Sequence, residues 1–310
     1  MSAVKVTFLG TGSTGDPSRR CGSTAVSLPD GTVILVDTAG GNEIWHALRE
    51  ASIDVARIRV IVLTHQHLDH AAGLPFVLFR LAMAGVPADG HRGPIDVCAP
   101  AAAVDDLRRM CEILVPGMFT PWWIGDRVRW HGCTSDQYVW GLDLRDDGTT
   151  SPTTARLGVP GDALPEGVIA TISTMAVSHG APPVPAQAVR IDAALANGEV
   201  RRVVISGDTG PNLGFTRFAG GVDLLIHEAI ESESLGANPF LVFGTGHVTA
   251  ASAGKVAAAS RVKRLALHHL NARTGQHPET VRAEAAEHFT GEILVPNDLD
   301  TTEVYGVRTC

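Results

Sequence analysis

The strongest constraint on the fold is where the chain places its histidines and carboxylates. Residues 58–63 form an apolar run that only Arg59 interrupts, which predicts a buried β-strand, and the motif His-Gln-His-Leu-Asp-His at 65–70 follows it almost directly. Later apolar runs predict strands that end near His179, Asp208 and the pair at 268–269. Loops at the carboxyl ends of buried strands are where functional groups gather. We therefore expect a fold that brings these polar side chains to one end of its sheets.

The order of apolar runs predicts an α/β protein. Strands come first in a cluster and then alternate with helices, in both halves of the chain. Strands are expected at 4–9, 23–28, 32–36, 58–63, 95–98, 168–177, 203–205, 224–226 and 265–267, and helices at 42–51, 71–83, 101–114, 249–259 and 278–289. Two mixed β-sheets packed face to face and flanked by helices, an αββα four-layer sandwich, would satisfy this order.

Length and composition favour one large layered domain over residues 1–310. The segment at about 122–166 stands apart, because it is rich in Gly, Asp, Thr and Pro and has weak periodicity. We expect it to be an insertion that forms a lid over the site. It carries five of the seven Trp and Tyr residues of the chain: Trp122, Trp123, Trp130, Tyr138 and Trp140.

Charge and cysteine usage narrow the function. The formal net charge of −8 gives no general attraction for phosphate backbones, so a nucleic-acid substrate would need a local basic patch. The five cysteines are scattered and form no CxxC pair, which argues against a disulfide framework and against a thiolate zinc site. Apolar runs fall short of the roughly 18 residues of a membrane span. These features predict a soluble cytoplasmic protein without a membrane partner.

The residue types at the strand ends favour metal ions. Imidazole and carboxylate ligands without thiolate suit Zn²⁺, with Mn²⁺ or Fe²⁺ as alternatives. The motif at 65–70 together with His179, Asp208 and His269 offers seven ligands, which is more than one tetrahedral ion needs. Such a set suits two ions about 3.5–4 Å apart, with a bridging hydroxide as the nucleophile. His268 is an alternative to His269, and the alternation of the preceding strand does not decide between them.

The motif HxHxDH, followed by isolated His, Asp and His residues, resembles the signature of the metallo-β-lactamase fold. The closer resemblance is to the ribonuclease Z-like and arylsulfatase-like branch, and it spans nearly the whole chain. The similar segments are Phe8–Ser13 with Pro17 and Arg20, Val36-Asp37, Leu63–Pro75, Ser206–Thr209, Asp223–Ala229, Gly246–Ala250 and His269–Arg273.

This resemblance implies a role for each site residue. Three residues would hold the first metal: His65, His67 and His179. Three would hold the second: Asp69, His70 and His269. Asp208 would bridge both ions, and Asp69 would also accept the proton of the attacking water. His247 would protonate the leaving group while Glu228 orients it, because a histidine acid needs a carboxylate to fix its tautomer. Asp37 is expected to orient a ligand histidine.

The resemblance predicts a two-metal hydrolase, most directly a phosphodiesterase. Two alternatives stay open: hydrolysis of a small lactone, ester, β-lactam or aryl sulfate, and a non-catalytic metal-binding protein. Ribonuclease Z enzymes carry a Gly/Pro- and Lys-rich arm that grips tRNA, and the stretch from His179 to Val203 has none. We therefore expect a small-molecule or nucleotide-like substrate and not structured tRNA. A homodimer is a further expectation from the resemblance.

Overall fold

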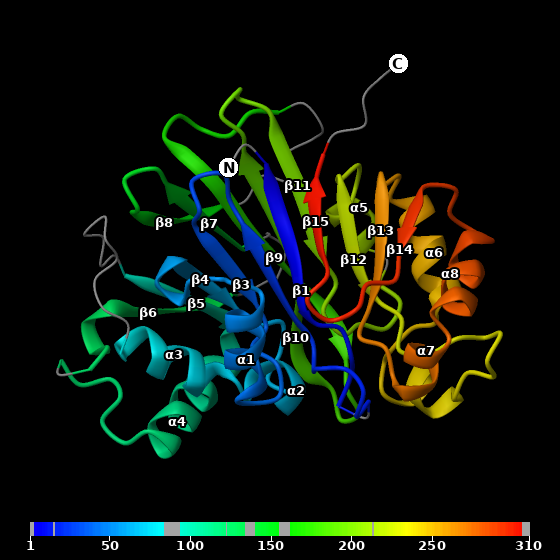
Figure 1. The fold of residues 1–310 in the computed structure, drawn as a ribbon, viewed down its shortest axis with the longest axis horizontal. Helices are drawn as coiled ribbons and strands as arrows, with labels where there is room; N and C mark the ends of the chain where they lie inside the picture. Colours follow the sequence, from blue (N-terminus) through cyan, green and yellow to red (C-terminus); the bar gives the residue numbers. More distant parts are fainter. Residues whose placement is uncertain are drawn as a thin grey trace.

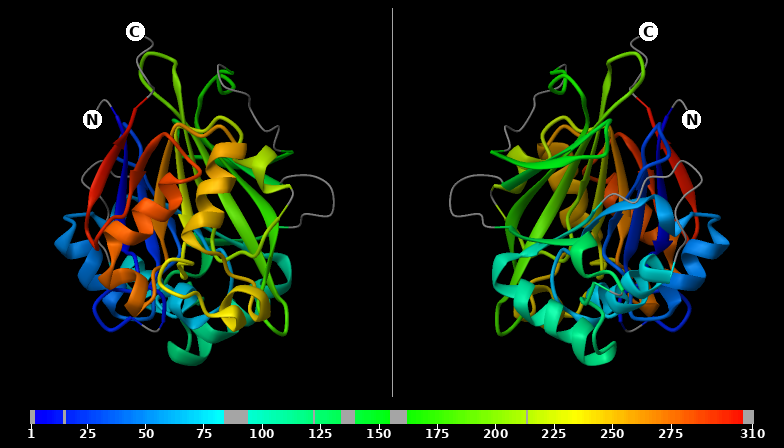
Figure 2. Two further views of the ribbon diagram at one scale, coloured as in Figure 1. Left: turned by 90° about the vertical axis from the view of Figure 1, so that its right-hand side faces the viewer. Right: turned by 90° about the vertical axis from the view of Figure 1, so that its left-hand side faces the viewer.

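The computed structural model describes residues 3–14, 16–83, 94–121, 123–133, 140–154, 162–212 and 214–305. Within these ranges two β-sheets pack face to face, and helices cover the outer face of each sheet (Figure 1). Figure 2 shows the same layers from both edges. This is the αββα sandwich that the sequence predicts, with parallel and antiparallel pairs in both sheets.

In the described residues the first sheet has the order β15-β1-β2-β3-β4-β5-β6 and the second the order β14-β13-β12-β11-β10-β9-β7-β8. The strands of the first sheet are β1 (Val4–Gly10), β2 (Ser23–Ser27), β3 (Val33–Val36), β4 (Ile58–Val62), β5 (Ile95–Pro100), β6 (Val128–Cys133) and β15 (Thr301–Val304). Those of the second are β7 (Trp140–Arg145), β8 (Thr150–Thr154), β9 (Val168–His179), β10 (Val184–Ala194), β11 (Val200–Ile205), β12 (Leu224–Glu228), β13 (Arg264–His268) and β14 (Glu292–Leu294).

The helices divide between the two outer faces. The α-helices are α1 (Glu43–Glu50), α2 (Leu68–Ala71), α3 (Leu74–Met83), α4 (Val104–Leu114), α5 (Phe215–Phe218), α6 (Ala250–Ala259), α7 (Ala272–Gln276) and α8 (Pro278–Ala286). Short 3₁₀ turns are η1 (Val55–Arg57), η2 (Ala101–Ala103) and η3 (Gly125–Arg127), and η4 (Phe240–Gly244) is a π-helical turn. Helices α1, α3 and α4 pack on the first sheet, while α5, α6 and α8 pack on the second.

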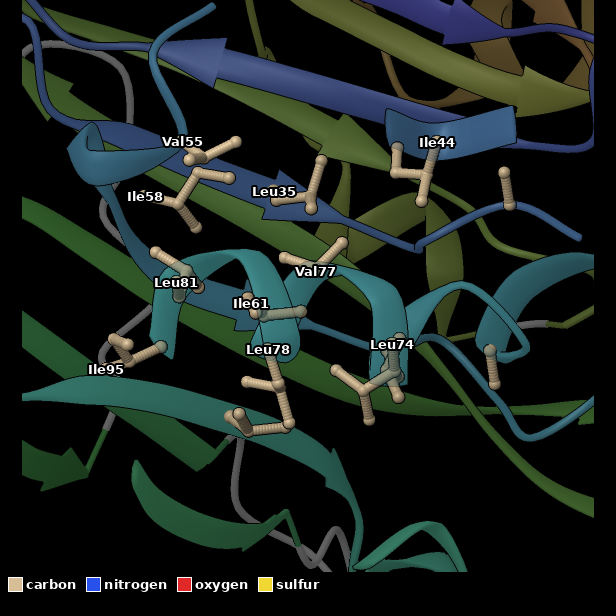
Figure 3. Packing of buried hydrophobic residues seen from close by; sticks show 14 of the residues in the cluster. Leu35, Ile44, Val55, Ile58, Ile61, Leu74, Val77, Leu78, Leu81 and Ile95 are labelled. Atoms are coloured by element: carbon tan, nitrogen blue, oxygen red, sulfur yellow. The ribbon is translucent and has the colours of Figure 1, made fainter. Parts of the chain in front are cut away.

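The central strands read as continuous apolar runs because both of their faces are buried. In β3, Val33 and Leu35 join the cluster under the helices, whereas Ile34 and Val36 face the second sheet. Figure 3 shows the helix side of this core, where side chains of α3 meet side chains of β3 and β4. Three apolar layers therefore hold the sandwich together and fix the strand ends relative to one another.

The segment at 122–166 differs from the expected lid. Its described parts supply β6 at the edge of the first sheet and β7 and β8 at one end of the second, so that it extends both sheets. Trp123 contacts Phe79 in a tilted arrangement and Trp130 meets Phe119 edge-on, while Trp140 begins β7, next to the edge strand β8. Trp122 and Tyr138 lie outside the described residues. The apolar pattern was weak because most of β6 is only half-buried, and because the buried part of β7 contains Gly141 and Asp143. The described aromatic residues do not gather over the strand ends.

No helix in the described part of the chain is long and apolar enough to cross a bilayer. The apolar cluster between the sheets takes side chains from both of them, and the single-domain interpretation stays a prediction.

Candidate metal centre

Asp208 lies at the centre of a histidine cluster at one end of the sandwich. It follows β11, and it is almost completely buried. Its Oδ2 atom lies 3.3 Å from Nε2 of both His70 and His269, and 3.7 Å from Nε2 of both His65 and His179. One carboxylate oxygen thus faces four imidazole nitrogens, two from each sheet.

The motif after β4 folds into a tight turn that directs the side chains of His65 and His70 toward this carboxylate. His67 begins α2 in an extended conformation, and Asp69 and His70 lie inside the helix. The expected helix at 71–83 is therefore two helices, α2 and α3. Helical geometry places Asp69 and His70 next to each other on one end of the cluster, while His65 and His67 face His179.

Two sets of ligand atoms come together as the sequence predicts. The nitrogens of His65, His67 and His179 lie within 4.8 Å of one another, and so do the ligand atoms of Asp69, His70 and His269. His179 Nε2 lies 3.2 Å from His67 Nδ1, and His269 Nε2 lies 3.4 Å from Asp69 Oδ2. The ligand roles of these residues stay a prediction.

Asp37 holds His70 in place. Its Oδ2 atom accepts a hydrogen bond from His70 Nδ1 at 2.8 Å, which turns Nε2 of that ring toward Asp208. The same carboxylate accepts hydrogen bonds from the backbone N–H and the hydroxyl of Thr64, at 2.7 and 2.8 Å. Asp37 itself has a φ of 58°, a left-handed backbone conformation that bends the chain sharply after β3. This is the orienting contact that the sequence predicts.

The choice between His268 and His269 follows from a backbone bend. His269 adopts a φ of 57°, so the chain reverses direction after β13. As a result the ring of His269 enters the cluster, while Nε2 of His268 is hydrogen-bonded to the carbonyl oxygen of Gly10 at 2.8 Å. Burial and the charge of His269 lower the pKa of His268 to about 4, so His268 is a neutral structural residue.

A second pair lies beside the cluster. His247 precedes α6, and its Nδ1 lies 3.1 Å from both carboxylate oxygens of Glu228, at the end of β12. Its ring stacks on His269 with centroids 5.6 Å apart and meets His179 edge-on at 4.8 Å. Burial acts against protonation of His247, but the charge and hydrogen bond of Glu228 prevail and raise its pKa to about 9.

The pKa shifts of the cluster histidines indicate that the site favours a positive charge. Burial lowers the pKa of His65 well below its usual value, which leaves this imidazole neutral and able to act as a ligand. Burial also opposes protonation of His70, yet the carboxylates of Asp208 and Asp37 outweigh it and raise the pKa of His70 well above the usual range. A cation at the cluster would take the place of that proton.

Unpartnered atoms test whether a metal ion fits. Among the described residues, the buried Nε2 atoms of His65 and His70 and the buried Oδ1 of Asp208 make no hydrogen bond. Buried polar groups are rarely left without a partner, and these three point into a set of imidazole and carboxylate donors. The donor set is the one that Zn²⁺ and similar ions prefer. The residues present therefore fit metal ions.

Two buried glutamates next to the site belong to no motif or pattern that the sequence analysis could recognise. Glu231 accepts hydrogen bonds from Asn271 Nδ2 at 2.7 Å and from the backbone N–H of Asn238 at 2.9 Å, and it pairs with Arg273. Glu284 on α8 accepts hydrogen bonds from three backbone N–H groups, at 233, 234 and 251, and from Ser232. Each lies in a loop or helix whose pattern gives no reason to single it out.

His227 also lies away from the cluster. It is buried against Phe215, with ring centroids 5.2 Å apart, and its Nδ1 lies 2.9 Å from the carbonyl oxygen of Glu228. Its neighbour Glu228 points to the opposite side of β12, as strand alternation requires.

A four-layer sandwich with a His/Asp cluster at the ends of its strands defines a metal-dependent hydrolase scaffold. The model of the metallo-β-lactamase superfamily matches residues 19–162. Ribonuclease Z of Halorubrum lacusprofundi is 27% identical, and the alignment covers 97% of each chain. Residues 19–162 thus carry a metallo-β-lactamase superfamily domain, and ribonuclease Z homologues are similar to the chain over nearly its full length.

Solved structures share the fold. The metallo-β-lactamase fold protein YhfI from Bacillus subtilis superposes with a TM-score of 0.68 at 20% identity and covers 97% of this chain and 99% of its own. The short form of human tRNase Z gives a TM-score of 0.68 at 21% identity, over 97% of this chain and 100% of its own. At this level of identity the likeness establishes the fold alone. The names of these relatives lend no support to the arylsulfatase-like part of the resemblance.

Proposed function

We propose that the chain is a metal-dependent hydrolase that cleaves phosphodiester bonds in a nucleic acid. The observation that carries this proposal is the convergence of four imidazole Nε2 atoms on Asp208 Oδ2, at 3.3–3.7 Å. Relatives named ribonuclease Z align with nearly the full length of the chain and support the bond type.

The proposed ligands form two groups with a shared carboxylate. His65, His67 and His179 would hold one Zn²⁺, Asp69, His70 and His269 a second, and Asp208 would contact both. Bound in this way, the ions would supply Lewis-acid charge and lower the pKa of a water molecule toward neutrality. Mn²⁺ and Fe²⁺ are alternatives for the same donor set.

The remaining steps belong to side chains of this protein. Asp69 lies among the proposed ligands, and its carboxylate accepts a hydrogen bond from the backbone N–H of Thr14 at 3.2 Å. In the proposed reaction Asp69 accepts the proton of the attacking water. His247 donates its Nε2 proton to the departing oxygen, because Glu228 already engages Nδ1 and stabilises the charged imidazolium.

The substrate proposal departs from the expectation drawn from the sequence. That expectation set structured tRNA aside because of a missing arm, an acidic chain and an aromatic lid. Trp130 and Trp140 lie in strands, and a ribonuclease Z relative aligns with 97% of the chain, so neither finding supports the exclusion. We propose that the substrate class is RNA, including structured RNA. We also propose that the protein acts in the cytoplasm and forms a homodimer.

The test pairs metal analysis with a substrate panel. Protein purified without chelator is assayed for metal by plasma mass spectrometry, then with a 3′-extended RNA, bis(p-nitrophenyl) phosphate, an aryl sulfate and an acyl lactone. The proposal expects about two ions per chain and hydrolysis of both phosphodiesters. Hydrolysis of the lactone or aryl sulfate alone favours the small-molecule alternative. Less than one ion per chain, with no hydrolysis, favours the non-catalytic alternative.

A further inference from the structure

The turn η4 (Phe240–Gly244) leaves two phenyl rings in solvent next to the proposed site. Phe240 is 66% exposed and Phe243 is 86% exposed. Exposed aromatic side chains forgo the stabilisation that burial would give them. π-helical turns are rare, and they occur frequently at functional sites. This combination points to a use other than folding.

Backbone hydrogen bonds fix this turn to the proposed catalytic groups. The backbone N–H of His247 donates to the carbonyl oxygen of Leu241 at 3.3 Å. The backbone N–H of Gly180, directly after His179, donates to the carbonyl oxygen of Thr245 at 2.9 Å. The hydroxyl of Thr245 closes the turn by donating to Leu241 at 2.8 Å. The backbone of the turn is therefore tied to the segments that carry His247 and His179.

Hydrogen bonds at Asn238 also hold the start of the turn in place. The backbone N–H of Asn238 donates to the buried carboxylate of Glu231 at 2.9 Å, and the side chain of Asn238 accepts from the backbone N–H of Phe240 at 3.0 Å. Glu231 also binds Asn271, two residues beyond His269. The same buried carboxylate therefore ties the turn to the strand end that carries a proposed ligand.

Gly244 fixes the ring of Phe240. A Cβ atom at position 244 would lie 2.8 Å from Cδ2 of Phe240, so the ring packs directly over the glycine backbone. Contact with Gly244 limits the ring on that side, while most of the side chain stays exposed. A ring held in this way loses little conformational entropy when a flat ligand stacks on it.

We propose that Phe240 and Phe243 form a stacking subsite for an unpaired nucleobase of the leaving strand. The inference rests on the proposed function. His247 protonates the departing oxygen in that reaction, so the nucleotide attached to this oxygen lies against the segment to which His247 is hydrogen-bonded. Stacking on aromatic rings binds any base and needs no basic patch, which suits a chain with a net charge of −8.

The test compares two RNA hairpins with a short 3′ tail. In one, the unpaired nucleotide directly before the scissile P–O3′ bond, whose O3′ is the departing oxygen, carries adenine, and in the other this nucleotide is abasic. The metal-loaded wild-type protein should show a kcat/KM about 5- to 150-fold higher for the adenine substrate, the range expected from one stacked base. Phe243→Ala and Phe240→Ala should bring that ratio close to one, and Phe243→Trp should preserve it. Gly244→Ala should lower the ratio without removing either ring.

The matched control is Ile113→Ala, because Ile113 on α4 is 65% exposed and lies outside the turn. It should leave the ratio unchanged. Equal losses on both RNAs in the phenylalanine variants, or an unchanged ratio, would overturn the subsite. A lower mass of Phe243→Ala in size-exclusion chromatography, with an unchanged ratio, would show instead that the rings contact a second copy. Cleavage of neither RNA by the wild type would overturn the proposed function itself.

Discussion

His247 Nδ1 lies 3.1 Å from both carboxylate oxygens of Glu228, at the edge of the cluster around Asp208. This contact fixes the tautomer of the imidazole and leaves Nε2 as the nitrogen that can deliver a proton. It also holds the loop before α6 against the end of β12, where the same carboxylate accepts from the backbone N–H of Val248 at 3.4 Å. The backbone N–H of Thr209, in the loop after β11, donates to this carboxylate at 2.6 Å.

Glu228→Gln is expected to slow cleavage more for a substrate whose leaving group needs a proton than for one whose leaving group does not. Proton donation by a positioned side chain contributes about 10²–10⁴-fold, so kcat for RNA should fall within that range. Hydrolysis of bis(p-nitrophenyl) phosphate should fall much less, because p-nitrophenolate departs without a proton. His247→Asn should behave in the same way. Steady-state kinetics with both substrates measure the difference, and a parallel loss on both would contradict the assignment.

Asp37→Asn is expected to weaken metal binding. The amide cannot take the place of the carboxylate charge that supports His70, and partners of ligand histidines typically contribute about 10–100-fold in metal affinity or activity. Competition with a chromogenic chelator measures the metal Kd. Asp30→Asn, at an exposed turn far from the cluster, is the matched control and should keep the wild-type Kd. An unchanged Kd for Asp37→Asn would refute the orienting role.

Metal removal is expected to abolish hydrolysis and to lower the Tm. Ions that bind only the folded chain add about 2.7 kcal/mol when present at 100 times their Kd, so dialysis against a chelator removes this contribution. Readdition of Zn²⁺ should restore both properties, as followed by differential scanning fluorimetry and RNA cleavage. Asp208→Ala should show the lower Tm without chelator and no response to Zn²⁺. A wild-type Tm that is indifferent to chelator would contradict the proposed sites.

Glu284 should contribute to stability in a pH-dependent way. Burial opposes ionisation of Glu284, but hydrogen bonds from Ser232 and three backbone N–H groups outweigh it and lower its pKa below the usual 4.5. A lowered folded-state pKa gives stability that is present above pH 4.5 and is lost as the pH falls through the folded-state value. Urea titrations of wild type and Glu284→Gln should therefore differ most near pH 7 and converge below pH 4.5. A difference that is constant with pH would argue against this role.

Gly73→Ala is expected to displace the backbone that supports His70. A Cβ at this position would lie 1.7 Å from the carbonyl oxygen of Thr38, whose backbone N–H and hydroxyl both donate to the carbonyl oxygen of His70. Overpacking typically costs about 1–3 kcal/mol, and here the backbone around His70 must move. Urea unfolding should show the loss in stability, and metal analysis should show fewer bound ions. Gly31→Ala, at an open turn with φ of 88°, separates backbone strain from crowding.

Much of the fold could be predicted from the sequence because its central strands are buried on both faces. The apolar runs of β3 and of 224–226 in β12 are uninterrupted, and only Arg59 interrupts β4, so the positions of these strands could be predicted. The outer strands β6, β7 and β8 were missed, as was β10, because half-buried or polar positions break the apolar pattern. In β10 the buried pair Arg190 and Asp192 interrupts it further.

The cluster was predictable to the extent that its residues follow strand ends. The orientation of His268 and His269 was not, since one left-handed residue decides which ring enters the site. The roles of Glu231 and of the phenyl rings of η4 could not be predicted from the sequence either. Their importance comes from hydrogen bonds to residues distant in the chain, which no local pattern encodes.

The cluster draws on both halves of the molecule: the motif at 65–70 from the first sheet, and His179, Asp208 and His269 from the second. Neither half alone supplies the full set of proposed ligands, so metal binding by the whole set would require the two sheets to dock first. Such non-local assembly is slow, because long loops have to close before their contacts form. A bound ion would then cross-link the two sheets, and the rate at which it dissociates would measure how often the sheets separate.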